Sequence, residues 1–195
     1  MNYIDFHAHH PAPEGCFALQ QQVLTQGVHP WSATMEDLSF VPDEGIWAIG
    51  ECGMDKLCST PMETQRAVFL HQIALSEERN LPMVIHCVKA LDEIVALRRE
   101  TNAKQPWIMH GFRGKPQQLQ TLLNANFYVS FGWHYNEDSI ALCPLEKMLL
   151  ETDDEDTANI ANLYRKVAER LGLSEKKLLA QMHVNAYTLF KSFGE

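Results

Sequence analysis

The sequence contains no hydrophobic run long enough to cross a membrane. None of its apolar stretches approaches the ~20 consecutive residues that a spanning helix requires. The first residues, MNYIDFHAHH, also lack the basic segment and the apolar core of a signal peptide. These two absences exclude a membrane-spanning protein and predict a cytoplasmic one that has no membrane among its partners.

The cysteines show no pairing pattern. There are five, an odd number, and no two of them form a CxxC motif. A disulfide framework is therefore excluded as the basis of the fold, and reduced thiols are expected.

The sequence also has fewer basic residues than acidic ones. The chain has 16 lysines and arginines against 25 acidic residues, which gives a formal net charge of −9. This balance argues against a broad basic surface for nucleic acid. Extended binding of a duplex is therefore not expected.

Internal repeats, low-complexity tracts and Gly/Ser linkers are missing too, so no domain boundary is visible. A chain of 195 residues, of which 46% are hydrophobic, is long enough to bury one sizeable core. We expect residues 1–195 to form a single domain.

What the chain does contain is an alternation of short apolar runs and amphipathic helix patterns. One helix pattern has a start signal at Thr60 and Pro61 and ends at Asn80, and a later one ends at Gly172. The apolar runs suit buried parallel strands; they are Tyr3–Phe6, Ile46–Gly50, Met83–Ile85, Trp107–Met109, Phe127–Phe131 and Met148–Leu150. This alternation predicts an α/β fold of the TIM-like (β/α) barrel type.

The segment after the first strand departs from this alternation. Residues 16–29 have the pattern of two short strands or a hairpin and no helix long enough for a crossover connection. We therefore expect a barrel that is distorted or incomplete near the N-terminus, with antiparallel pairing between residues 10 and 30 in place of a βα unit.

Metal-binding side chains follow five of the predicted strands. They are His7 and His9, Glu51, His86, His110 and Asp153. The carboxyl ends of the strands of a parallel barrel lie on one face, where active sites form, so these residues are expected to converge. His7 and His9 are two residues apart on a strand and point to the same side.

Four histidines and two carboxylates supply enough ligands for two divalent cations that share a bridging carboxylate. A hydroxide shared by two such cations is a strong nucleophile at neutral pH, and the pair can clamp a phosphate oxygen. Mixed imidazole and carboxylate ligands accept Zn²⁺, Mn²⁺, Mg²⁺, Fe²⁺ or Ni²⁺, so the sequence does not select the metal.

Basic residues also follow predicted strand ends; they are Lys56, Lys89, Arg113 and Lys115. They either add to the positive field of two bound cations, with Arg113 contacting substrate, or are ordinary solvated surface cations.

Seven sequence motifs, in this order, resemble the TatD family of metal-dependent deoxyribonucleases, within the wider amidohydrolase-like superfamily. They are DFHAH (5–9), GVHPW (27–31), AIGECGMD (48–55), LPMVIHC (81–87), MHGFRG (109–114), LLETD (149–153) and NAYTLF (185–190). The chain resembles a shortened member of the family, because only residues 10–28 separate His9 from His29.

The resemblance implies a role for each matching residue. One cation would be held by His7, His9, Glu51 and Asp153. The other would be held by Glu51, His86 and His110, so that Glu51 bridges. Asp153 would also orient or deprotonate the attacking water, and His29 would lie near the substrate phosphate without being a primary ligand.

The loops that would face the substrate depart from the family pattern. Asp154-Glu155-Asp156 replaces a small residue and proline after LLETD, and Val88-Lys89 stands where an arginine usually follows the histidine motif. Gly111 and Arg113 likewise replace a cysteine and a serine. The resemblance therefore implies the metal ligands and does not specify the substrate.

The preferred interpretation is a phosphodiesterase that acts on DNA or a small phosphodiester, with no obligate protein partner evident. A hydrolase of a small ester, lactone or amide is one alternative, because the same nucleophile attacks a carbonyl carbon. A metal-binding scaffold without catalysis is another, although the presence of Asp153 beside a complete ligand set argues against it.

Overall fold

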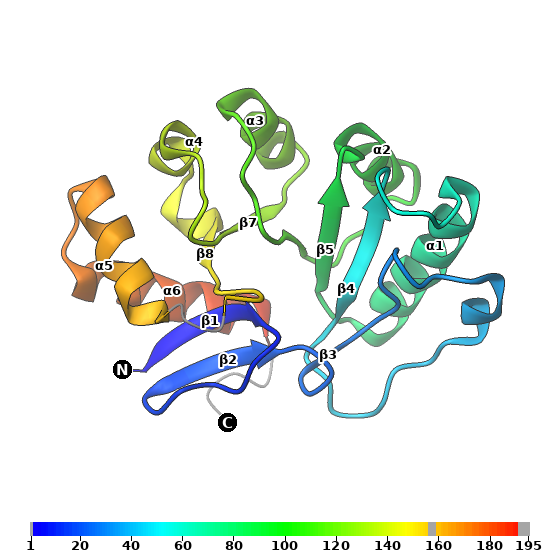
Figure 1. The fold of residues 1–195 in the computed structure, drawn as a ribbon, viewed down its shortest axis with the longest axis horizontal. Coiled ribbons are helices and arrows are strands. Elements are labelled where there is room, and N and C mark those ends of the chain that lie inside the picture. The colour runs from blue at the N-terminus through cyan, green and yellow to red at the C-terminus, as the bar shows by residue number, and fades with distance from the viewer. Residues whose placement is uncertain (1, 156–158, 191–195) are drawn as a thin grey trace.

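The computed structural model describes residues 2–155 and 159–190. Asp156, part of the acidic run after LLETD, lies outside them. Within the described residues the chain forms eight strands (Figure 1), which are β1 (Tyr3–Ala8), β2 (Cys16–Gln20), β3 (Thr25–Gln26), β4 (Ala48–Asp55), β5 (Met83–Val88), β6 (Trp107–Met109), β7 (Tyr128–Phe131) and β8 (Met148–Leu150).

Helices follow most of the strands from β4 onwards. They are α1 (Met62–Arg79), α2 (Leu91–Glu100), α3 (Pro116–Asn124), α4 (Glu137–Leu142), α5 (Ile160–Leu171) and α6 (Glu175–Leu189), with short 3₁₀ turns η1 (Met35–Ser39) and η2 (Leu145–Lys147). As predicted, α1 ends at Asn80 and α5 at Gly172, both in the left-handed conformation that closes a helix. In the described part of the chain, no helix is long and apolar enough to cross a membrane.

All strand pairs are parallel and follow chain order. Strands β3 to β8 form one sheet in the order β3-β4-β5-β6-β7-β8, and β1 pairs with β2. Backbone bonds join the two sheets: the Asp153 N–H, beyond β8, donates to the His7 carbonyl of β1 at 3.0 Å, and the Gln22 N–H, after β2, donates to the Thr25 carbonyl of β3 at 2.8 Å. The predicted parallel α/β fold is confirmed, and its strands follow the order of a (β/α) barrel.

The prediction of antiparallel pairing between residues 10 and 30 is wrong. Strand β2 runs parallel to β1, with Tyr3 opposite Cys16 and Asp5 opposite Ala18. The absence of a helix was predicted correctly, since none lies between His9 and His29, a segment that the structure describes in full. Residues 9–15, in extended form, span roughly 20 Å, which is enough to return along a six-residue strand without a helix.

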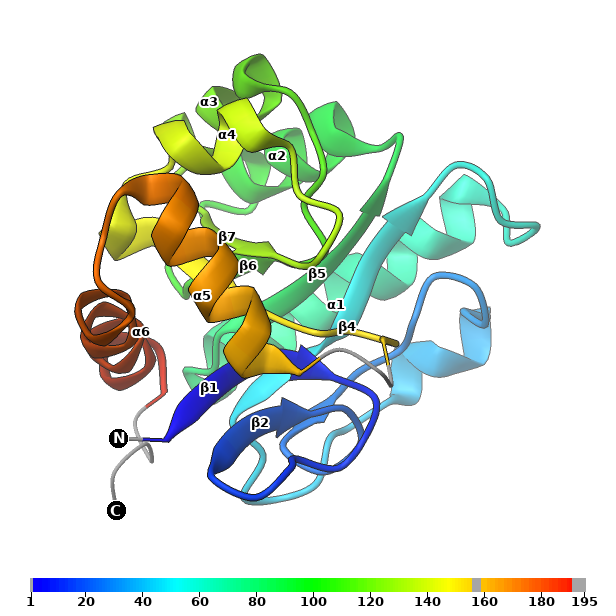
Figure 2. The same cartoon turned by 60° about the vertical axis from the view of Figure 1, so that its left-hand side comes forward.

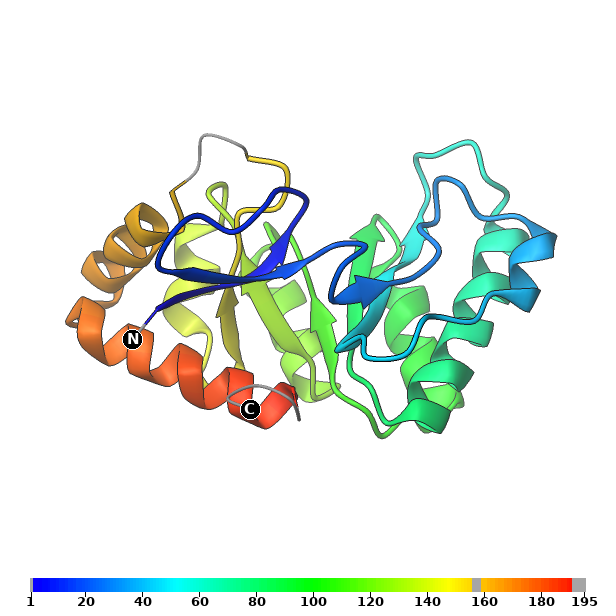
Figure 3. The ribbon, with the colours of Figure 1, turned by 90° about the horizontal axis from the view of Figure 1, so that it is seen from below.

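Helices cover the outer face of the strands. Helices α5 and α6 contact β1, whereas α1 contacts β4 at the other end of the molecule (Figures 2 and 3). The apolar core lies between these layers and is built from strand residues such as Phe6, Ile49 and Trp107, all fully buried. The buried acids and His7 instead gather toward the carboxyl ends of the strands; the acids are Asp5, Glu51, Asp55 and Glu151. Burial of so many charged groups in one place requires partners for them.

Candidate active site

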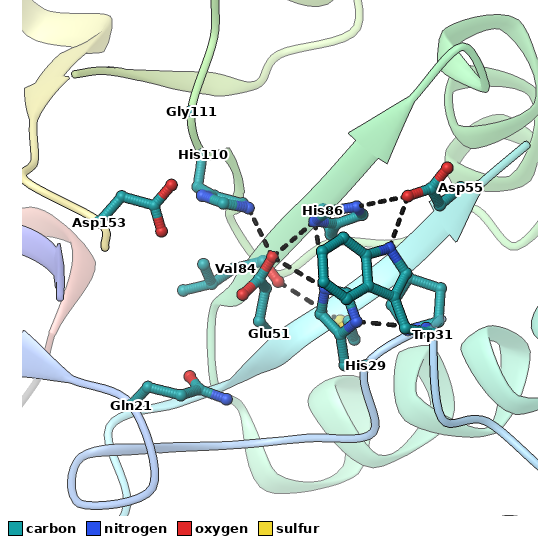
Figure 4. A network of polar contacts seen from close by, with 12 residues as sticks. Gln21, His29, Trp31, Glu51, Asp55, Val84, His86, His110, Gly111 and Asp153 are labelled. Atoms are coloured by element: carbon teal, nitrogen blue, oxygen red, sulfur yellow. Dashed lines mark hydrogen bonds and ion pairs between the residues drawn. The ribbon is translucent and has the colours of Figure 1, made fainter. Parts of the chain in front are cut away.

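Glu51 is the centre of a cluster of imidazoles (Figure 4). Its Oε2 atom lies 3.5 Å from Nε2 of His7 and 3.5 Å from Nε2 of His9. Its Oε1 atom lies 2.6 Å from Nδ1 of His86 and 2.7 Å from Nε2 of His110. The two oxygens of one carboxylate therefore face two separate sets of histidines.

The shape of β4 carries Glu51 into this position. Strand β4 is longer than predicted, so Glu51 lies within it rather than at its end, and its register against β5 shifts between Ile49 and Cys52. Such a bulge re-aims a side chain. Gly50 makes the close approach possible: its φ is 152°, and a Cβ there would meet the Val84 carbonyl oxygen at 2.6 Å.

Asp153 reaches the same cluster from beyond β8. Its Oδ1 lies 3.6 Å from Nε2 of both His7 and His9. The backbone of Asp153 is tied to β1 on both sides, because its carbonyl also accepts the His9 N–H at 3.2 Å. Burial, and then the negative charge of Glu151, raise the pKa of the Asp153 carboxyl.

The pKa values in the cluster reflect strong mutual attraction. Burial on its own would raise the pKa of Glu51 and lower that of His110. The positive charge and the hydrogen bond of His110, together with hydrogen bonds from His29 and His7, instead hold the pKa of Glu51 far below its usual range. The carboxylates of Glu51 and Glu151 hold the pKa of His110 well above its usual value.

The chemistry of these donors fits divalent cations. Nε2 of His7 lies 3.2 Å from Nε2 of His9, and both face carboxylate oxygens, so a proton or a metal ion must stand between these lone pairs. Among the described residues there are four groups in which the ligand atoms lie within 4.8 Å of one another: His7, His9 and Asp153; His7, Glu51 and His110; His29, Glu51 and His86; and His110, Glu151 and Asp153. Imidazole and carboxylate ligands are those that catalytic metal ions use.

His29 lies closer to the cluster than the resemblance implies. Its Nε2 is 3.2 Å from Glu51 Oε1 and 3.2 Å from His86 Nδ1, which puts it within one of the candidate cation groups. It also lines a cavity of about 270 Å³ together with other residues of the cluster and Trp31.

Arg113 is placed differently from the cluster residues. It is exposed and lines a second cavity, of about 460 Å³, that also borders His86, His110, Lys89 and Asp153. Lys56 and Lys115 line neither of these two cavities, and Lys56 is paired with Glu93 of α2.

Two acids in the site were not predicted from the sequence. Asp55 Oδ2 lies 3.3 Å from Nε2 of His86 and accepts the Trp31 indole N–H at 2.6 Å. Glu151 Oε1 lies 3.4 Å from Nδ1 of His110 and accepts the Gly111 N–H at 2.5 Å. Carboxylates on the far nitrogen of a ligating histidine orient its ring. Both acids belong to motifs quoted above: Asp55 is the last residue of AIGECGMD, and Glu151 lies within LLETD.

A parallel α/β barrel with a buried carboxylate ringed by imidazoles at the carboxyl ends of its strands defines a metal-dependent hydrolase. Comparison with known sequences gives the family. The profile described as TatD related DNase matches residues 17–191, and the chain belongs to that family.

Individual relatives agree with this assignment. The uncharacterized metal-dependent hydrolase YabD of Bacillus subtilis is 34% identical over 143 residues, which are 65% of this chain and 56% of YabD. The 3'-5' ssDNA/RNA exonuclease TatD of Escherichia coli K12 is 28% identical over 200 residues, covering 85% of this chain and 76% of TatD.

Solved structures show the same fold. The crystal structure of YJJV, a TatD homolog from Escherichia coli, aligns with a TM-score of 0.73 and 21% identity over 92% of this chain and 78% of that one. A TatD family hydrolase from Entamoeba histolytica aligns with a TM-score of 0.67 and 17% identity over 74% of this chain and 63% of the other.

Proposed function

We propose that this chain, acting as one domain of residues 1–195, hydrolyses phosphodiester bonds of DNA with two divalent cations held on the two sides of Glu51. The observation that carries the proposal is the sorting of imidazoles: His7 and His9 face Oε2, whereas His86 and His110 face Oε1. The name of the TatD relative, a 3'-5' ssDNA/RNA exonuclease, supports the choice of substrate.

The ligands divide between the two oxygens of Glu51. On the Oε2 side, His7, His9 and Asp153 would hold one cation. On the Oε1 side, His86 and His110 would hold the other. Bound divalent cations would lower the pKa of a coordinated water and draw charge from the phosphate oxygens.

Asp153 would act as the general base. Its carboxylate lies at the edge of the cluster, where Oδ1 faces His7 and His9, so a water held by the cation on this side would pass its proton to Asp153. The backbone bonds to β1 fix Asp153 in place, so a proton taken up at Oδ1 or Oδ2 moves to a carboxylate of defined position.

His29 would contact the substrate phosphate. It is half-buried, lines the 270 Å³ cavity and has its Nε2 beside Glu51 Oε1. Because Nδ1 accepts the Trp31 backbone N–H, the ring N–H of His29 is at Nε2, and it would donate to a phosphate oxygen placed in this cavity.

The surface charges favour a single strand over a duplex. Arg113 and Lys89 border the larger cavity, whereas exposed Asp154 lies 4.0 Å from Nε2 of His9 on the other side. A positive field confined to the cations and one cavity can hold a few phosphates but offers no broad basic surface.

The test compares three substrates after metal loading with Mg²⁺, Mn²⁺ or Zn²⁺. Single-stranded DNA and bis-p-nitrophenyl phosphate should be hydrolysed, and p-nitrophenyl acetate should not be. Turnover of the acetate ester in the absence of phosphodiester cleavage would replace the proposal with a carboxylic ester hydrolase. If the protein binds metal but turns over none of the three substrates, it would be a metal-binding scaffold without catalysis.

A further inference from the structure

Trp31 is a large aromatic residue left in solvent at the rim of the site. Its exposed fraction is 63%, whereas Trp107 is fully buried. It belongs to the GVHPW motif, and the proposed chemistry gives it no task. An indole this exposed beside a buried polar cluster requires an explanation other than core packing.

The indole is held in a fixed orientation. Its Nε1–H donates to Asp55 Oδ2 at 2.6 Å, and the Trp31 carbonyl accepts the Thr60 hydroxyl at 3.0 Å. Its backbone N–H donates to Nδ1 of His29 at 3.2 Å. Because the ring and the backbone are both tied down, binding a ligand on this ring costs little side-chain entropy.

The ring forms one wall of the 270 Å³ cavity that holds the histidines and Glu51. Its centroid lies 4.8 Å from that of His29 and 5.8 Å from that of His86, with interplanar angles of 84° and 80°. Figure 4 shows the indole almost face-on in front of these two histidines. Because 63% of Trp31 is exposed, much of its surface is accessible directly beside the position proposed for the phosphate.

A second exposed apolar residue is bonded to the same acid as Trp31. Leu57 is exposed to 65%, and its backbone N–H donates to Asp55 Oδ1 at 2.7 Å. The same carboxylate thus fixes the indole through one oxygen and the Leu57 loop through the other.

We infer that Trp31 is a stacking subsite for one nucleobase of a single-stranded substrate, next to the phosphodiester that occupies the cluster. The inference rests on the proposed function and extends it to the recognition of a base of the substrate. Every base has a π face, so an indole accepts each of them. The subsite therefore gives affinity for a base and tolerance of its identity.

A competing structural role can be separated from stacking by two variants. Trp31→Phe removes the N–H that bonds to Asp55 but keeps an aromatic face. Trp31→Leu removes both. If the indole served only to orient Asp55 and His86, the two variants would be equally impaired.

The experiment measures binding rather than turnover. Short phosphorothioate-linked oligothymidylate, which resists hydrolysis, is compared with an abasic strand of equal length in the presence of Mg²⁺. We expect the native chain to prefer the base-bearing strand by roughly tenfold. Trp31→Leu should remove that preference and leave abasic binding unchanged, and Trp31→Phe should keep most of it. Tyr187→Leu, which changes an exposed aromatic residue of α6 outside both cavities, is the matched control.

The inference would be overturned if Trp31→Leu weakened the binding of both strands equally or left the preference unchanged. It would also be overturned if the native chain bound neither strand. Hydrolysis of unmodified DNA is assayed separately. If unmodified DNA is not hydrolysed, the proposed function is wrong, and the binding comparison still decides whether Trp31 stacks on a base.

Discussion

Asp153 and His7 are joined twice, once through the backbone and once through their side chains. The Asp153 N–H donates to the His7 carbonyl at 3.0 Å, and Asp153 Oδ1 lies 3.6 Å from Nε2 of His7. The contact that connects β8 to β1 is therefore also the contact that completes one side of the site. Pairing of the first and last strands therefore also brings these two candidate cation ligands together.

His7→Ala should empty the Oε2 side of Glu51 while the Oε1 side keeps its cation, because His86 and His110 are untouched. Activity should fall through loss of metal and recover in part at excess Mn²⁺. Metal content per chain and turnover across a Mn²⁺ titration measure both effects. His71→Gln, a change within α1 where Nε2 of His71 bonds to the Phe40 carbonyl, is the control and should alter neither. Retention of a full metal complement by His7→Ala would contradict the ligand assignment.

Asp55→Asn should weaken cation binding on the Oε1 side by roughly 10- to 100-fold, because the carboxylate that orients the His86 ring is lost. The measurement is a metal titration without nucleic acid. Glu93→Gln, which removes a half-buried acid paired with Lys56, serves as the control. An unchanged titration curve for Asp55→Asn would show that the His86 ring is oriented by other contacts.

The candidate ligands could be selected because strand ends and ligand types are both visible in sequence. In the structure, the other five proposed metal-binding residues lie around Glu51. Asp55 and Glu151 were missed because their role depends on which ring nitrogen of His86 and His110 points away from Glu51, which only the folded backbone determines. A parallel β1–β2 pair was missed because such pairs usually need a crossover of a dozen or more residues, whereas here residues 9–15 suffice.

Asp5 should make the stability of the metal-free protein depend on pH. Burial raises the pKa of this carboxyl from 3.8 to about 7, against the opposing hydrogen bonds from Thr152. The folded state therefore binds a proton more tightly than the unfolded state, so this group stabilises the fold fully below the unfolded pKa. Its contribution is lost as pH rises from about 4 to about 7.

Asp5→Asn keeps an oxygen that can accept the Thr152 N–H, which the native carboxylate accepts at 3.0 Å, but it cannot ionise. The free energy of unfolding of the variant, measured in urea, should decline less over this range than that of the native chain. Parallel pH profiles for the two proteins would show that Asp5 has the same pKa folded and unfolded.

The most direct test of the account is DNA hydrolysis by Asp153→Asn across a Mn²⁺ titration, with bound metal measured on the same samples. The amide cannot accept a proton from water, so turnover should fall by roughly 10²- to 10⁴-fold. At least one cation should remain bound, because Glu51 and the histidines are intact, and excess Mn²⁺ should rescue hardly any activity. Near-normal turnover by Asp153→Asn at saturating Mn²⁺ would contradict the account, since Asp153 would then be at most a ligand.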